Sequence, residues 1–263
     1  MEPTELIVWG GAAAAATYHP IVQRVLGPTA DYLGQALSTC TEKGAQNLGR
    51  IMHHAIKKLG TRIDREESVP PKVMKSLLLD APFIEDELSA EYFGGVLASS
   101  RSGVSRDDRA ATLMALLARL STYQLRTHYI IYSEVKRQFN GSSLDVGEQV
   151  VRERTFVLIP LDAYIRAMDF TQDENVSPIL DHAVFGLLAE DLIDTEQYAC
   201  GSHEHVRAVF PAAESGGLYV GPSSRGAELF LWAHARADLD VSDFLDSSVR
   251  LEFDTPLETL GSA

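Results

Sequence analysis

Apolar residues recur every three or four positions through most of the first half of the chain, which is the spacing of an amphipathic α-helix. Residues 43–59 show this pattern most clearly, because basic side chains occupy positions between the apolar ones. The predicted helix ends near Gly60 and continues one that starts at Thr29, a typical N-cap residue. Its apolar face consists of Leu48, Ile51, Met52, Ala55, Ile56 and Leu59.

A second amphipathic helix is predicted over residues 85–98, and it contains two consecutive glycines. Gly94 and Gly95 each destabilise a helix by roughly 1 kcal/mol relative to alanine. We therefore expect a neighbouring helix to pack closely against this point.

Two serines mark the starts of the next helices. Ser105 and Ser121 are each followed three residues later by a side chain, Asp108 or Gln124, that resembles the second half of a capping box. The second of these helices ends at the Asn-Gly pair at 140–141.

Together with a short helix at 72–79, these elements predict one all-helical domain of five or six helices over residues 28–140. Residues 1–27 form a separate N-terminal segment in this interpretation.

The pattern changes in the second half of the chain. Residues 155–159 are a short apolar run that could be a strand or the lead into a helix, and helices are predicted at 161–170 and 178–192. A Glu-Ser-Gly-Gly turn signal at 214–217 then separates two short apolar stretches, which is typical of a β-hairpin. These stretches are Val206, Val209 and Phe210 before the turn and Leu218, Tyr219 and Val220 after it.

Ser223 and Ser224 would cap a last helix that runs to residue 237. Helix, helix, hairpin and helix is the order of a winged-helix unit with an additional terminal helix. The expected fold is therefore mainly α, an N-terminal helical bundle followed by a winged-helix-like α+β unit at 155–240 and an acidic tail at 241–263.

The charge of the chain bears on the kind of partner. The formal net charge is −14, and residues 181–263 contain fifteen Asp and Glu against four Arg. A duplex-binding surface needs several Lys or Arg to displace counterions from phosphates. Nucleic acid is therefore an unlikely partner of the last third of the chain, and the predicted helix 178–192 carries neither Lys nor Arg.

One basic surface remains as a candidate site for an anionic partner. It consists of Lys43, Arg50, Lys57, Lys58 and Arg62 on and after the helix at 43–59. The alternative is that these residues form an ordinary solvated helix face.

No complete catalytic or metal-binding set is visible, and no cofactor motif is present. His203 and His205 fall at a predicted loop or strand edge, where residues two apart face the same side and could share a zinc ion with Cys200. Because no further ligand stands at a useful spacing, this metal site is the weaker interpretation. The serines and cysteines lack a nucleophile motif, so an enzymatic activity is not expected.

The two cysteines, Cys40 and Cys200, give no disulfide framework, so a reducing cytoplasm fits best. The apolar stretch from Leu6 to Ala16 is about half the roughly 20 residues that a membrane span needs, and acidic residues precede it where a signal peptide is positive. Contact of this stretch with a membrane is possible but not favoured.

Several stretches between Gly27 and Phe139 resemble the Abi-alpha family, a bacterial group of proteins of unknown function that is linked by name to abortive infection. The clearest is APFIEDELSAEYFGGVLASS at 81–100, where a small residue and an acidic turn precede a helix that ends in Leu-Ala-Ser. The sequence departs from the family at 104–107, where a short proline-containing segment would be expected. The other matching stretches are 27–29, 33–37, 47–59, 69–73 and 120–123.

The resemblance implies phage defence through growth arrest or death of the infected cell, and it brings no active residues with it. The implied partner is a protein, phage-encoded or encoded beside this one, and the apolar faces at 113–132 allow a homo-oligomer or an internal core. Two other functions stay open from the residues alone. They are a winged-helix transcriptional regulator and a metal-dependent hydrolase.

Overall fold

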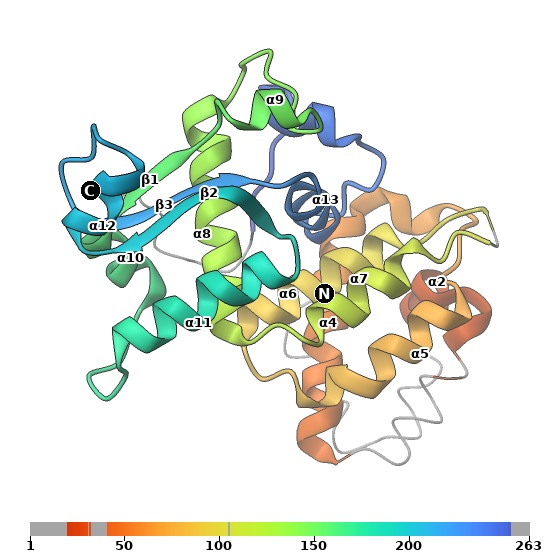
Figure 1. Cartoon of the computed structure of the whole chain (residues 1–263). Coiled ribbons are helices and arrows are strands. Elements are labelled where there is room, and N and C mark those ends of the chain that lie inside the picture. The colour runs from red at the N-terminus through yellow and green to blue at the C-terminus, as the bar shows by residue number, and fades with distance from the viewer. Residues whose placement is uncertain (1–19, 31, 33–40, 105, 254–263) are drawn as a thin grey trace. The chain divides into compact units, whose positions relative to one another are not determined.

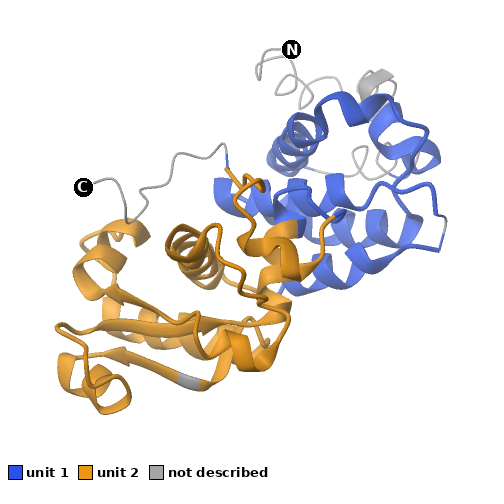
Figure 2. Cartoon of the chain, turned by 90° about the horizontal axis from the view of Figure 1, so that it is seen from above, with its two compact units in different colours: residues 1–119, 232–238, 253–255 blue, residues 120–231, 239–252, 256–263 orange. Residues whose placement is uncertain are grey.

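The computed structural model describes residues 20–30, 32, 41–104 and 106–253. Two compact units make up the chain (Figure 2). Unit 1 comprises residues 1–119, 232–238 and 253–255, and unit 2 comprises residues 120–231, 239–252 and 256–263. The predicted N-terminal stretch from Leu6 to Ala16 and the tail beyond residue 253 lie outside the described residues.

Unit 1 is helical, as the apolar spacing predicts. Its longest helix, α4, begins after the Thr41 N-cap, whose hydroxyl accepts a hydrogen bond from the Gly44 N–H at 3.1 Å. The predicted continuous helix from Thr29 does not pass through Thr41, whose backbone is extended. The helices of unit 1 are α2 (Pro20–Leu26), α4 (Glu42–Leu59), α5 (Pro71–Asp80), α6 (Glu87–Ser99) and α7 (Arg109–Leu117).

The two consecutive glycines of α6 lie where neighbouring backbone comes closest. A Cβ atom on Gly94 would lie 2.9 Å from the Ile51 carbonyl oxygen of α4, and one on Gly95 would lie 1.7 Å from the Ala233 carbonyl oxygen. The prediction of close packing at these glycines is confirmed. The absence of a side chain lets α4 and α6 approach until their backbones touch.

Unit 2 contains a small antiparallel sheet in the order β1-β3-β2. Val157 in β1 pairs with Val220 in β3, and Ala199 in β2 pairs with Tyr219 on its other side. Helix α8 runs behind this sheet in the view of Figure 1. The strands are β1 (Val157–Pro160), β2 (Ile193–Gly201) and β3 (Gly217–Pro222). The helices are α8 (Thr122–Phe139), α9 (Gln149–Arg152), α10 (Leu161–Met168), α11 (Val176–Ala189) and α12 (His203–Val209). The first eight residues of α13 (Ser224–Ala233) also belong to unit 2.

The order of these elements is that of a winged helix. Helix α8 and the short helix α9 are followed by strand β1, by helices α10 and α11 and by the strands β2 and β3, and β1 pairs with β3. The expected mainly α fold with a winged-helix-like α+β unit is confirmed, and the apolar run before Pro160 is a strand. Helix α13 begins where predicted, because the Ser223 hydroxyl accepts the Gly226 N–H at 2.9 Å.

Two details of the winged unit differ from the sequence interpretation. The first strand of the hairpin is β2, and Val206 and Val209 belong to helix α12, which lies in the connection between the two strands. Helix α8, predicted to be part of the all-helical domain at 28–140, groups with the sheet instead. The reason is its buried face, where Tyr132 packs against Phe230 and Phe244 of unit 2.

The segment after α13 is better packed than an acidic tail suggests. A 3-10 helix, Val241–Leu245, follows an Asp240 cap, and the side chains of Phe244 and Leu245 are buried. Among the described residues, no helix is long and apolar enough to cross a membrane.

Candidate functional site

The predicted basic surface lies on α4 and the turn after it, and its charges are largely engaged within unit 1. Lys43 Nζ lies 2.6 Å from a Glu85 carboxylate oxygen, and Arg50 bonds Glu87 at 3.2 Å and the Ile84 carbonyl at 3.0 Å. These acids stand at the start of α6. The basic face is therefore mostly neutralised by acids of the same unit.

Lys58 and Arg62 also have partners within unit 1. Lys58 forms an ion pair of 2.8 Å with Glu91 that is almost completely buried, and Arg62 donates to the Ala235 carbonyl at 2.9 Å. Lys57 is exposed. As a site for a highly charged anion, this face offers far less free positive charge than its sequence suggests.

The candidate metal ligands do not converge. His203 and His205 are the first and third residues of α12, so their side chains point about 200° apart around the helix axis and not to one side, as on a strand edge. His203 Nε2 donates to the Ala213 carbonyl at 2.9 Å, and His205 Nδ1 lies 2.8 Å from the Ser202 hydroxyl. The strand-edge expectation for this pair is therefore wrong.

Cys200, at the end of β2, faces a carboxylate. Its thiol lies 3.9 Å from an Asp181 oxygen, and burial together with this negative charge raises the pKa of the Cys200 thiol. The thiolate, which is the form that binds metals and attacks electrophiles, is disfavoured here. No group of three metal-ligating side chains is found in the described part of the chain.

Helix α11 occupies the position that reads DNA in a DNA-binding winged helix, and its outer face has a different character. Leu180, Ala183, Val184 and Leu187 are buried against the rest of unit 2. Phe185 projects outward with 52 % of its surface exposed. The exposed residues of α11 are Ser177, Pro178, Asp181, His182, Phe185 and Ala189, which we call the α11 face.

The start of α8 holds α11 in place. Ser121 and Gln124 form the predicted capping box, with the Gln124 side chain accepting the Ser121 N–H at 2.8 Å. The same two side chains reach α11, where the Ser121 hydroxyl lies 3.0 Å from His182 Nε2 and Gln124 Nε2 donates to the His182 carbonyl at 3.5 Å. The capping residues of α8 therefore also orient α11.

This serine and histidine pair is a structural contact. A catalytic dyad needs a serine hydroxyl that is free to attack and donors placed for the resulting oxyanion. The Ser121 hydroxyl instead accepts the Gln124 N–H at 3.3 Å as a helix cap.

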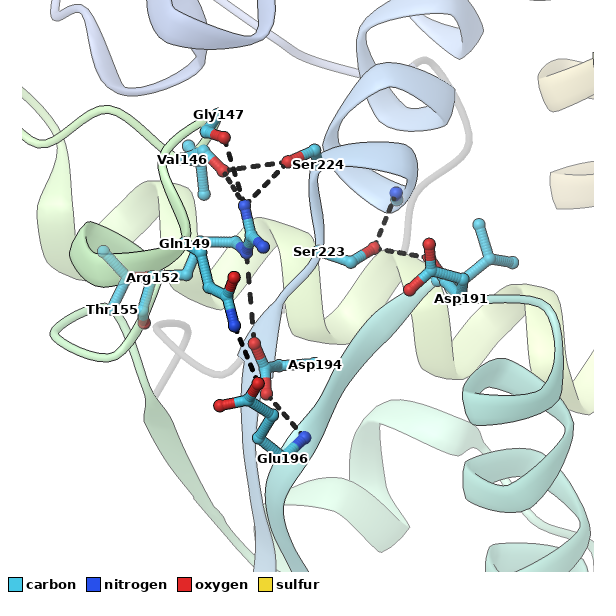
Figure 3. A network of polar contacts seen from close by, with 12 residues as sticks. Val146, Gly147, Gln149, Arg152, Thr155, Asp191, Asp194, Glu196, Ser223 and Ser224 are labelled. Atoms are coloured by element: carbon cyan, nitrogen blue, oxygen red, sulfur yellow. Dashed lines mark hydrogen bonds and ion pairs between the residues drawn. The ribbon is translucent and has the colours of Figure 1, made fainter.

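A polar network around Arg152 fixes the segment before β1 (Figure 3). Arg152 Nη1 donates to the Val146 and Gly147 carbonyls, both at 3.2 Å, and to the Ser224 hydroxyl at 2.8 Å. The Gln149 amide bonds Glu196 at 2.7 Å. The sequence gives no sign of this network, since its members come from three separate stretches.

The connection between β2 and β3, which corresponds to the wing, contains α12. Its only basic side chain is that of Arg207, beside Glu204. Neither α11 nor this wing provides the cluster of basic side chains that phosphate contacts need. The chemistry of the winged unit favours contact with protein side chains.

The comparisons with known proteins add no further constraint. The chain matches no protein-family model, no curated protein and no solved structure.

Proposed function

We propose that this chain is a bacterial anti-phage defence protein of the abortive-infection type, which works in the cytoplasm by contacting another protein. Two kinds of observation support the proposal. The stretches between Gly27 and Phe139, above all 81–100, resemble the Abi-alpha family. The winged unit presents an apolar and acidic surface where a DNA-binding unit presents a basic one.

The observation that carries the protein-contact part of the proposal is the α11 face. Phe185 stands at its centre, and Asp181, one helical turn earlier, is the one carboxylate on that face. Aromatic residues are enriched at protein interfaces, whereas charged residues are depleted at interface centres. This composition fits a partner that covers Phe185 and meets a carboxylate at the rim.

The defence activity is testable by expressing the chain in a bacterial host and challenging it with a broad panel of phages. We expect fewer plaques than with an empty vector. At high phage-to-cell ratio the culture should collapse or stop growing, because abortive infection sacrifices the infected cell. Unchanged plaque counts across the whole panel would count decisively against a defence role.

A pair of variants tests the surface separately from the activity. Phe185→Ser removes the exposed ring from the α11 face, and Val150→Ser changes a side chain on α9 that is 75 % exposed. Both variants should fold, because neither side chain belongs to the core. We expect F185S to lose protection and V150S to retain it; equal protection by both would rule out the α11 face as the contact surface.

The winged topology by itself favours a second candidate, a transcriptional regulator. The α11 face contains no Lys or Arg, which is evidence against this function, because duplex binding depends on positive charge. Its test is direct binding to duplex DNA.

A further inference from the structure

The aromatic ring of Phe253 sits among three side chains of unit 1. It stacks on His234 with ring centres 4.0 Å apart, and it meets the Tyr92 ring edge to face at 5.1 Å. Lys58 Nζ lies over the ring, 4.5 Å from its centre. We call Lys58, Tyr92 and His234 the Phe253 socket.

The socket is built on an ion pair. Lys58, which touches Phe253, also donates to Glu91 at 2.8 Å, and the Glu91 side chain has no exposed surface. Tyr92 is fully buried and His234 nearly so. The wall of the socket is therefore formed by a cation and two aromatic rings that are held rigidly by the core of unit 1.

Such a socket can be emptied without exposing an aliphatic core. Lysine, carboxylate and imidazole groups are all well solvated by water, so water can take the place of the ring beside them. A socket lined with leucine or valine would have to stay filled. The polar character of this one makes its occupant replaceable.

Among the described residues of this segment, Phe253 is the one that enters the socket. Phe253 is half-buried, whereas its neighbour Glu252 is exposed and Leu251 is only half-buried. In the sequence Glu252 and Asp254 flank the ring on both sides. The segment that fills the socket is thus a short linear motif, a phenylalanine between two acids.

We propose that the Phe253 socket is a peptide-binding site that the chain's own C-terminal segment occupies, and that a partner segment with a phenylalanine between acidic residues can replace it. The ring supplies the contact with His234, Tyr92 and Lys58, and the acids keep the peptide soluble. The tail acts as a competitor tethered to its site, at an effective concentration far above that of a free peptide. Binding at the Phe253 socket does not depend on whether the protein acts in defence.

The test uses the full chain with Phe253→Ala, which empties the socket without shortening the protein. The probe is a fluorescein-labelled peptide of residues 247–258, and its binding is followed by fluorescence anisotropy. We expect saturable binding to F253A and binding to the wild-type chain that is at least about tenfold weaker, because the tethered Phe253 competes. A peptide with alanine in place of its phenylalanine should bind F253A about tenfold more weakly than the natural one.

Second-site variants locate the binding. In the F253A background, His234→Ala should weaken the natural peptide severalfold, whereas Arg106→Ala, an exposed change in the same unit, should leave it unchanged. Circular dichroism and thermal unfolding confirm that each variant is folded. A folded F253A chain that does not bind the peptide, or that binds both peptides equally, overturns the proposal.

Discussion

At the scale of single residues, Arg101 does more for unit 1 than any motif in the sequence suggests. Its side chain is buried, and its guanidinium donates hydrogen bonds to carbonyls of the turn and loop after α4 and to one of α2. These hydrogen bonds all go to backbone carbonyls and hold a loop that has little secondary structure of its own. The accepting carbonyls are those of Arg24, Arg62, Ile63, Arg65 and Glu67.

Replacement of Arg101 by methionine should therefore destabilise the protein by about 3 kcal/mol, since several buried carbonyls lose their donor at once. Lysine should rescue only part of this loss, because an ammonium group cannot fan out over the same set of acceptors. Urea unfolding measures both variants. The control is Arg106→Met, an exposed position five residues later in the chain. An equal loss of unfolding free energy for both variants would refute the role given to Arg101.

Glu87 gives a second prediction at this scale. The hydrogen bond from His54 Nε2, 2.7 Å long, is the main cause that lowers the pKa of the Glu87 carboxyl below its ordinary value of 4.5, with burial acting in the opposite direction. A lowered folded-state pKa means that the pair stabilises the fold above the unfolded value and that this contribution is lost as the pH falls through the folded value.

The stability difference between the wild type and Glu87→Gln should accordingly be largest at neutral pH and shrink as the pH falls below 4.5. Urea midpoints measured at several pH values between about 3 and 7 would show it. Glu66→Gln, an exposed change in the same unit, serves as the matched control. A difference that stays constant over the range would show that the His54 contact does not depend on the charge of Glu87.

At the scale of helices and strands, the contact at Gly95 determines how close α6 comes to its neighbour. A methyl group there would meet the Ala233 carbonyl carbon at 2.3 Å as well as its oxygen, so the backbone must move. Gly95→Ala should destabilise the protein by about 2 kcal/mol or more, although alanine is the better helix former.

Gly103→Ala is the matched control, because an added Cβ at Gly103 meets nothing within 4 Å. The melting temperature of G103A should match that of the wild type, and that of G95A should be several degrees lower. If G95A were as stable as the wild type, the two backbones could not be in contact as described.

The elements also show why the winged unit was only partly predictable. The order of helices and the turn at 214–217 indicate the unit, but β2 alternates poorly and contains an irregularity between Ile193 and Tyr198. Its pattern therefore resembles a loop. Val206 and Val209 suggest a strand because valine favours strands. In the structure both belong to helix α12, where Val206 is buried.

At the scale of the whole molecule, net charge and its distribution decide which partners are accessible. The chain carries −14 formal charges, and its basic surface is largely engaged within unit 1 through Lys43, Arg50, Lys58 and Arg62. The apolar faces at 113–132 that suggested an oligomer are largely buried within the single chain. The buried residues among them are Leu113, Met114, Leu116, Leu117, Leu125, Tyr129, Ile130, Ile131 and Tyr132.

Duplex DNA should therefore not bind. In fluorescence anisotropy with a labelled duplex, we expect no shift at protein concentrations up to about 10 µM at about 150 mM salt, because nonspecific binding at such salt already needs several phosphate contacts. A lac-type repressor domain under the same conditions would serve as the positive control. Binding that weakens steeply with added salt would restore the regulator as the leading function.

The sequence by itself determined the helices with strong apolar periodicity, the caps at Ser121 and Ser223, the close contact at the two glycines of α6 and the general order of a winged unit. These features depend on residues close together in the chain, so the local pattern contains them. Only the tertiary structure decided that Glu87 and Glu91 engage the basic face of α4, that α8 belongs with the sheet, and that Phe253 fills a socket on unit 1. Those contacts join residues far apart in the chain, and no local pattern of charge or hydrophobicity specifies which distant side chain will be the partner.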